Sequence, residues 1–222
     1  MNRYFSPAAI CVLLSLLPLQ GCGGPAATSA GEGTTPARPG HDEAGTSASA
    51  DNDPLHPRVE LHTTAGLIVV ELDAQHAPAT VENFLRYVRE GHYNHTIFHH
   101  VERDYVVLGG GYTRQLYVRR GRSPIRNESD NGLKNVRGSV AMAREPDHAD
   151  SATCQFFINV VDNPELDYRG SSPDARGYCV FGRVIQGMDV VDRISRVKVR
   201  RHEGFSHLPV KTVLIQRAVE LR

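Results

Sequence analysis

The sequence of 222 residues contains no tryptophan, only four cysteines and no net charge, and each of these shortages excludes something. Without tryptophan, no contact in the protein can use an indole ring. A formal net charge of zero at pH 7 gives no overall attraction to nucleic acid or to anionic lipid. Long hydrophobic runs are missing as well, because the apolar stretch over residues 10–19 is only about ten residues long and too short to cross a bilayer. No internal repeat is evident.

The short apolar stretch is instead typical of a targeting signal. It follows Arg3 and ends in Leu19-Gln20-Gly21-Cys22, which resembles a bacterial lipobox. We therefore expect residues 1–21 to be a lipoprotein signal peptide and Cys22 to be acylated after cleavage. An ordinary secretory signal with an incidental cysteine is the alternative. Gly23 favours the outer membrane, so we expect a lipid-anchored protein of the bacterial cell envelope that faces the periplasm.

Residues 22–54 are rich in Gly, Ala, Ser, Thr and Pro and have almost no large apolar side chain. Such a segment cannot bury enough surface to fold and is expected to be a flexible linker with an rms span of roughly 30 Å. Residues 55–222 then form the folded domain, in which Cys154 and Cys179 are the remaining cysteines. A disulfide between them and a pair of buried free thiols are both open.

The folded domain shows many short strand patterns and two separated helix patterns. Because strands and helices do not alternate regularly, a doubly wound sheet is not favoured, and a closed antiparallel barrel with helices over its ends fits the order better. Helices are predicted over residues 78–91 and 188–195. Strands are predicted over residues 59–63, 67–72, 97–101, 105–108, 139–143, 155–161, 179–185 and 213–219.

An ordered set of short motifs resembles the cyclophilins, the peptidyl-prolyl isomerases, and is closest to their periplasmic bacterial branch. The resemblance implies a mainly β fold, a closed eight-stranded antiparallel barrel capped by two helices. The motifs are Ala79-Thr80-Val81-Glu82-Asn83-Phe84, Phe98-His99-His100-Val101, Gly109-Gly110-Gly111, Asn127-Glu128, Gln155-Phe156-Phe157-Ile158-Asn159, Val180-Phe181-Gly182 and Gly187-Met188-Asp189-Val190-Val191.

The reaction that the resemblance implies is rotation about an X–Pro peptide bond, whose barrier is about 18–20 kcal/mol. It requires no nucleophile, metal or cofactor. An apolar pocket holds the proline ring, and a guanidinium donates a hydrogen bond that favours the twisted transition state. The expected partners are proline-containing segments of exported proteins, with no nucleic acid, and the protein is expected to be a monomer.

Carried over residue by residue, the resemblance assigns Gln155 to binding of the substrate backbone. Arg144 stands where many members have asparagine, and Tyr178 stands at the pocket histidine. Leu108 and Glu165 also fall at site positions, where they replace a glutamine and a bulky aromatic residue. The remaining expected pocket residues are Phe157, Leu166, Ala143, Tyr105 and Val106.

The main departure from the family pattern is His100, which stands at the catalytic arginine. Loss of one transition-state donor costs roughly 10²–10³ in rate. Neutral imidazole still donates one hydrogen bond, and its protonation near pH 6.5 predicts that activity rises as the pH falls from about 8 to 6. Arg103 or Arg144 could supply the missing donor instead. The turn Glu102-Arg103-Asp104 also departs from the family pattern.

Two function classes remain open. One is a peptidyl-prolyl isomerase of reduced activity, with His100 and Gln155 as catalytic residues. The other is a catalytically weak or inactive proline-peptide binding module or chaperone at the cell envelope. A metal site of His92, His95, His99 and His100 is not favoured, since adjacent residues of a strand point to opposite faces. The arginines of residues 114–126 are expected to lie on a solvated loop.

Overall fold

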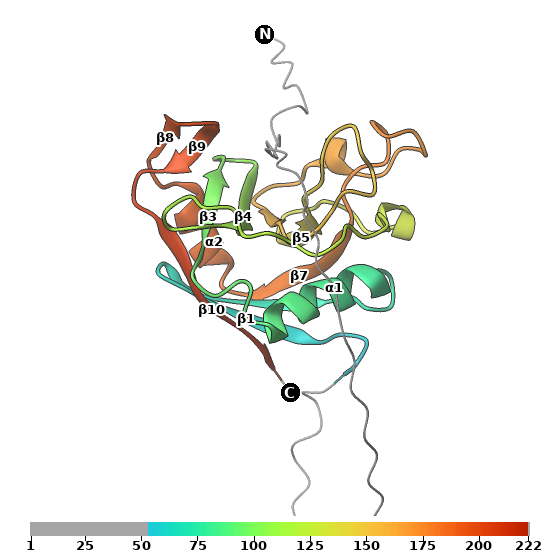
Figure 1. Ribbon diagram of the computed structural model, residues 1–222. Coiled ribbons are helices and arrows are strands. Elements are labelled where there is room, and N and C mark those ends of the chain that lie inside the picture. Colours follow the sequence, from blue (N-terminus) through green and yellow to red (C-terminus); the bar gives the residue numbers. More distant parts are fainter. Residues whose placement is uncertain (1–52, 222) are drawn as a thin grey trace, which may run out of the picture.

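The structure is a computed structural model that describes residues 53–221. The predicted signal peptide 1–21, the predicted acylation site Cys22 and nearly all of the predicted linker 22–54 lie outside the described residues. The described part contains a closed antiparallel barrel with the strand order β1-β10-β3-β4-β6-β5-β7-β2 (Figure 1). This confirms the predicted mainly β fold, with eight strands in the barrel and two α-helices.

The elements follow the predicted order, and most differ from prediction only in their ends. β4 is longer than expected, because it continues through the glycine run to Thr113. The elements are β1 (Arg58–Thr63), β2 (Gly66–Leu72), α1 (Pro78–Arg89), β3 (Thr96–Val101), β4 (Val106–Thr113), η2 (Ser129–Asn131), β5 (Ser139–Met142), β6 (Phe156–Asn159), η3 (Pro164–Leu166), β7 (Val180–Gln186), α2 (Met188–Ser195), β8 (Val199–His202), β9 (Phe205–Pro209) and β10 (Val213–Leu221).

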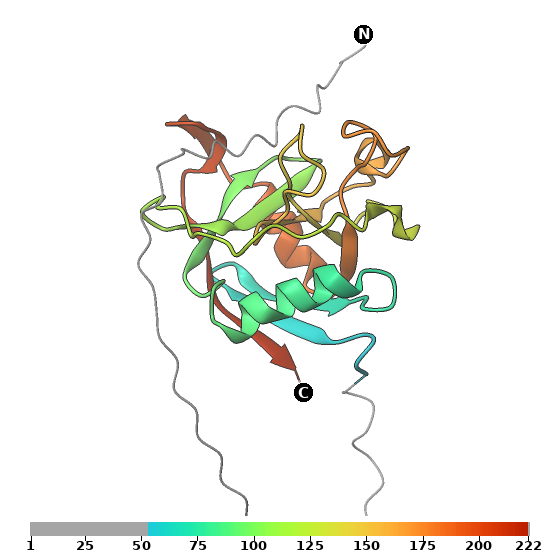
Figure 2. The same cartoon turned by 45° about the vertical axis from the view of Figure 1, so that its right-hand side comes forward.

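Helix α1 lies against the barrel (Figure 2). Its buried residues, among them Val81, Phe84 and Val88, form one apolar face, as the residue spacing predicts. The Phe84 ring packs 5.4 Å from that of Phe156 and 5.1 Å from that of Phe181, between ring centres. The first turn is held by a distant carboxylate, since Glu128 accepts hydrogen bonds from the backbone N–H and the hydroxyl of Thr80 at 2.9 and 2.7 Å. A negative charge at a helix N-terminus is stabilising, which gives a physical reason for the Asn127-Glu128 motif.

The barrel strands separate two sets of apolar side chains. Val107, Phe156 and Ile158 belong to the main core, which fills the barrel. Val106 and Phe157, their neighbours in sequence, belong to a second buried cluster. Because successive residues of a strand point to opposite faces, the second cluster lies on the outer face of β4, β5, β6 and β7.

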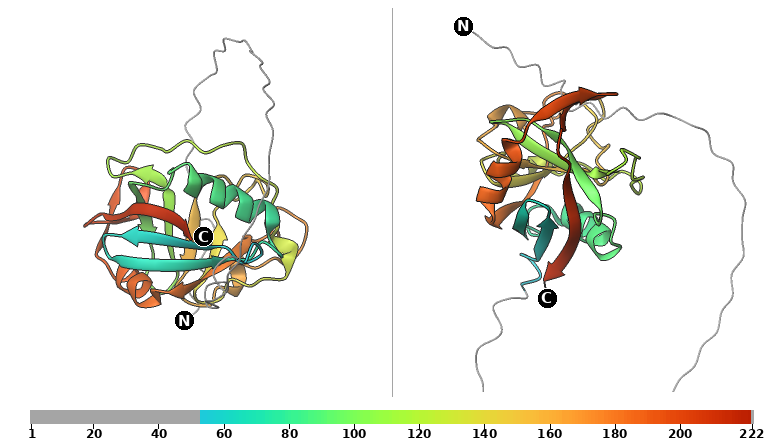
Figure 3. Two further views of the ribbon diagram at one scale, coloured as in Figure 1. Left: turned by 90° about the horizontal axis from the view of Figure 1, so that it is seen from below. Right: turned by 90° about the vertical axis from the view of Figure 1, so that its left-hand side faces the viewer.

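Strands β8 and β9 were not predicted and form a separate two-stranded hairpin between α2 and β10. The sequence of β8 lacks a clear alternation of apolar and polar residues, and none of its residues is buried. The hairpin extends from the body of the molecule beside β3 (Figure 3). It is held there by a small cluster in which Leu208 and Phe205 pack with Ile97 and Tyr112.

Candidate functional site

A row of directly opposed residues crosses the outer face of five barrel strands. His100 of β3 pairs with Leu108 of β4, and Leu108 pairs with Phe157 of β6. Phe157 in turn pairs with Ala141 of β5, which pairs with Val180 of β7. Residues that oppose each other across antiparallel strands share a face. Strand pairing therefore places His100, which is expected to stand at the family's arginine position, at one end of the apolar row.

Most of the expected pocket residues meet in the outer cluster along this row, which we call the outer apolar cluster. Phe157 and Leu166 are fully buried in it, and the ring of Tyr178 stands edge-on to that of Phe157 with 5.6 Å between ring centres. A proline ring can therefore reach Phe157 only if a covering side chain moves. The cluster consists of Val106, Leu108, Ala141, Ala143, Phe157, Leu166, Tyr178 and Val180, with Tyr105 and Leu133 packed against it.

A buried network of asparagines fixes Leu166 in this cluster. The amide of Asn159, which is fully buried, donates to Ser139 Oγ at 2.8 Å and to Asn135 Oδ1 at 3.2 Å. Its oxygen accepts from Asn163 at 2.7 Å, and Asn135 donates to the carbonyl of Leu166 at 3.1 Å. The network connects η3 to the barrel and thereby fixes the position of Leu166 beside Phe157.

Gln155 lies at the start of β6 and packs on the backbone of the glycine run. A Cβ atom on Gly111 would come within 2.5 Å of Gln155 Cδ, so a larger residue at Gly111 would displace the amide. Gln155 Oε1 is buried and has no hydrogen-bond partner among the described residues. A buried acceptor without a partner costs free energy, so this oxygen is well suited to accept a backbone N–H from a bound peptide.

The two arginines considered as replacements for the missing donor are differently placed. Arg144 is buried and donates to the carbonyls of Gly177, Glu145, Pro146 and Pro173 at 2.8–2.9 Å. Its guanidinium is therefore occupied in holding the loop that leads to Tyr178. The side chain of Arg103 is 73 % exposed and lies 3.7 Å from the Asp104 carboxylate in the β3–β4 turn. Neither arrangement favours donation to a substrate carbonyl beside His100.

A β-bulge in β3 overturns the expectation that His99 and His100 point to opposite faces. Phe98 pairs with Gly109, and His100 pairs with Leu108. The two partners in β4 are adjacent in sequence, so His99 is an extra residue in β3 without a partner in β4. Such a bulge re-aims side chains. Both histidines contact β9, since His99 lies 6.0 Å from Phe205 and His100 lies 5.0 Å from His207, between ring centres.

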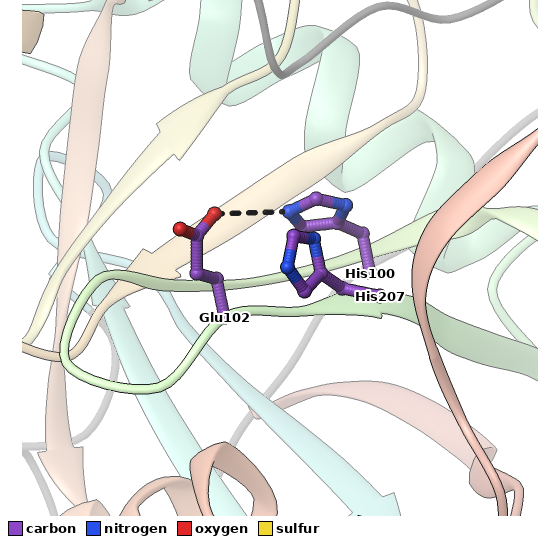
Figure 4. A group of neighbouring side chains, drawn as sticks. All are labelled: His100, Glu102 and His207. Carbon is purple, nitrogen blue, oxygen red and sulfur yellow. Dashed lines mark ion pairs between the residues drawn. The ribbon is translucent and has the colours of Figure 1, made fainter. Parts of the chain in front are cut away.

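His100 is enclosed by Glu102 and His207, as Figure 4 shows. Its Nε2 atom lies 3.6 Å from Glu102 Oε2, and its side chain is only 9 % exposed. Burial, and next the proximity of His207, lower the pKa of His100 below its usual 6.5. Protonation of His100, and any gain of activity that depends on it, is therefore expected at lower pH than for an unperturbed histidine. Burial lowers the pKa of the adjacent His99 to about 3.

Glu165 is exposed at the edge of the outer apolar cluster, and its charge affects the pKa of Tyr105. Burial, and then the charge of Glu165, raise the pKa of the Tyr105 hydroxyl, which stays protonated as a donor. A cleft of about 600 Å³ adjoins the cluster at Leu133 and Val180. Its walls also include Glu71 and Arg183, which were not predicted as site residues.

Cys154 and Cys179 are both free and buried, which favours the pair of buried thiols over the disulfide among the two alternatives. Burial raises the pKa of the Cys179 thiol to about 12, which leaves it uncharged and unreactive at neutral pH. Among residues 53–221, no helix is long and apolar enough to span a membrane.

His207 is the residue beside His100 that sequence reasoning missed. It lies on the unpredicted hairpin, about a hundred residues from His100 in the chain, and no motif surrounds it. Only the folding of β9 against β3 brings the two rings together.

The chain matches the family of the cyclophilin type peptidyl-prolyl cis-trans isomerases over residues 58–220. It is 52 % identical over 160 residues to peptidyl-prolyl cis-trans isomerase cyp18 of Streptomyces antibioticus, covering 72 % of this chain and 96 % of that protein. It is 48 % identical over 159 residues to peptidyl-prolyl cis-trans isomerase B of Escherichia coli K12, with 71 % and 96 % covered. The chain therefore belongs to the cyclophilin-type peptidyl-prolyl cis-trans isomerase family.

A solved structure supports the same fold. A cyclophilin type peptidyl-prolyl cis-trans isomerase of Cryptosporidium parvum aligns with a TM-score of 0.61 and 24 % identity, and the alignment covers 74 % of this chain and 97 % of that one. At this identity the likeness concerns the arrangement of the barrel and helices.

Proposed function

We propose that this peptidyl-prolyl cis-trans isomerase accelerates X–Pro bond rotation in exported proteins, at a reduced rate because His100 stands at the position of the catalytic arginine. The relatives that are 45–52 % identical to this chain are named as peptidyl-prolyl cis-trans isomerases. The observation that carries the proposal is the row from His100 through Leu108 to Phe157, which aligns a polar end with an apolar pocket. A prolyl peptide requires these two environments side by side.

The row and the neighbouring Gln155 each have a role in the proposed reaction. The outer apolar cluster around Phe157 holds the proline ring after a covering side chain moves. Gln155 Oε1, which lacks a partner, accepts a backbone N–H of the substrate. Neutral His100 donates a single hydrogen bond and lacks the fork and permanent charge of arginine, so the transition state is stabilised less than in relatives with arginine.

The proposed location of the enzyme at the cell envelope rests on the amino-terminal residues alone. Acylation at Cys22 would anchor the chain by several acyl chains, each buried CH₂ contributing about 0.8 kcal/mol. A linker over residues 22–54 would then keep the barrel close to the membrane, where newly exported chains expose X–Pro bonds. Labelling with a radioactive or clickable fatty acid tests this, because a Cys22→Ser variant should lose the label.

The isomerase proposal is tested with a proline tetrapeptide in the presence of a chelator. The parent protein is compared with His100→Arg and with His100→Arg combined with His207→Ser. Since His207 lies 5.0 Å from His100, the larger arginine needs the space that the second change creates. We expect kcat/KM to rise by roughly 10–10³-fold in the double variant, in line with the value of one transition-state donor.

The alternative, a proline-peptide binding module, makes a different prediction in the same assay. If the parent and both variants bind the tetrapeptide but none turns it over above the uncatalysed rate, the binding module is supported. If none of them binds the peptide while all remain folded by circular dichroism, both functions are wrong.

A further inference from the structure

We infer that His100, Glu102 and His207 form a binding site for a divalent transition-metal ion of the zinc type. One potential ligand atom of each side chain lies within 4.8 Å of those of the other two. The site shares His100 with the polar end of the His100–Leu108–Phe157 row, but binding of the ion does not depend on the isomerase being active. We refer to these three residues as the His-Glu-His cluster (Figure 4).

The chain geometry explains why three ligands from distant segments converge. His100 ends the bulged part of β3, and Glu102 follows two residues later, where the strand alternation returns to the same side. His207 comes from the middle of β9, whose hairpin is fixed by the packing of Leu208 and Phe205. Two ligands are thus held by the barrel and the third by the hairpin.

The distances are close to those that a tetrahedral metal requires. With metal–ligand distances of about 2.0–2.2 Å, neighbouring ligand atoms lie roughly 3.3–3.5 Å apart. His100 Nε2 and Glu102 Oε2 are already 3.6 Å apart. The ligand atom of His207 lies within 4.8 Å of those of the other two residues, so a movement of about 1.3 Å or less would complete the set.

A second observation indicates that the cluster lacks a ligand. The His100 side chain is more than nine-tenths buried. Its Nε2 atom is also buried and has no hydrogen-bond partner among the described residues. A buried polar atom left without a partner costs about 1–3 kcal/mol, so such atoms need an explanation. Coordination of a cation would satisfy this nitrogen and the nearby carboxylate together.

The ligand types determine the class of ion. Two imidazole nitrogens and one carboxylate oxygen suit zinc and its neighbours in the first transition row, whereas calcium and magnesium prefer oxygen ligands alone. His207 Nδ1 lies 3.1 Å from Ser206 Oγ, a contact that can orient the ring as a second layer of support. Three protein ligands leave one tetrahedral position open, and it would lie at the polar end of the His100–Leu108–Phe157 row.

The inference is tested by titrating the untagged chain with Zn²⁺ and with Co²⁺, by calorimetry and by the visible absorption of bound Co²⁺. We expect one ion per chain at this cluster and a cobalt spectrum of low coordination number. Glu102→Gln and His207→Gln should each weaken binding by more than about a hundredfold, since loss of an outer-layer partner alone typically costs 10–100-fold. Mg²⁺ in excess should not displace the ion.

His76→Gln is the matched control, because His76 also contacts a carboxylate, that of Asp73 at 2.8 Å, but is not part of the cluster. It should leave the affinity unchanged. Thermal unfolding of each variant without metal shows whether the fold is retained. The inference is wrong if the parent binds no Zn²⁺ saturably, if both cluster variants bind as tightly as the parent, or if His76→Gln weakens binding as much as they do.

Discussion

The guanidinium carbon of Arg144 lies 5.0 Å from the centre of the Tyr178 ring, which itself stands edge-on to Phe157. The same guanidinium donates four hydrogen bonds to loop carbonyls. Arg144 therefore fixes the loop and, through a cation–π contact, the ring that covers the floor of the pocket. Its role is to position Tyr178.

This role predicts the effect of Arg144→Lys. A lysine cannot reproduce the planar fork, so several carbonyl bonds are lost and we expect a decrease in unfolding free energy of about 1–3 kcal/mol. Isomerase kinetics should change mainly in KM, because Tyr178 becomes less fixed. A fall in kcat of roughly 10²–10³ at constant KM would instead assign Arg144 as the donor to the substrate.

Gln155→Met separates binding from stability. The substitution keeps an unbranched side chain against Gly111 but removes the unpaired acceptor Oε1. We expect kcat/KM for a prolyl peptide to fall by about tenfold, the value of one hydrogen bond of about 1.4 kcal/mol. Urea unfolding should show an unchanged or slightly higher stability, because a buried unsatisfied acceptor is gone. A large loss of stability would contradict a binding role.

Asn159→Ala tests the network beneath the pocket wall. The change leaves polar groups of Asn135, Ser139 and Asn163 without their buried partner, and we expect a loss of about 2–4 kcal/mol in the unfolding free energy. Amide hydrogen exchange should increase most in η3, which the network holds. A loss below about 0.5 kcal/mol would show that the network contributes little.

The buried environment of His92 leads us to expect that the stability of the folded chain depends on pH. The ring of His92 contacts those of Tyr87 and Tyr93, its Nε2 is buried without a partner among the described residues, and burial lowers its pKa. The unfolded chain therefore binds a proton at His92 near pH 6.5 before the folded chain does, so stability falls as the pH decreases below about 6.5.

We expect His92→Phe to reduce this loss of stability. Urea unfolding at about pH 7.5 and about pH 5, with a chelator present, measures the difference between the two conditions for parent and variant. His148→Ala serves as the control, because the His148 side chain is 74 % exposed and its removal should leave the difference unchanged. An equal pH effect in parent and His92→Phe would show that His92 does not contribute to it.

The barrel, both α-helices and the meeting of the pocket residues could be predicted because they depend on local patterns and on ordered motifs. Leu108 and Phe157 lie on regular strands, where alternation determines which face a side chain occupies. The environment of His100 could not be predicted in this way. A bulge at His99 breaks the alternation, and His207 approaches from a hairpin whose first strand has no buried residue and no clear apolar period. The hydrogen bonds of Arg144 to the loop carbonyls of Gly177 and Pro173 could not be predicted either, because no sequence pattern indicates where those carbonyls lie.

Strands β8 and β9 pair with each other in a two-stranded sheet, and neither belongs to the barrel sheet. Grafting a different hairpin between α2 and β10 would therefore change the chemical groups beside His100 while the hydrogen bonding of all eight barrel strands stays intact. The protein thus carries an exchangeable segment at its candidate site, through which natural variation or engineering can alter the site without rebuilding the fold.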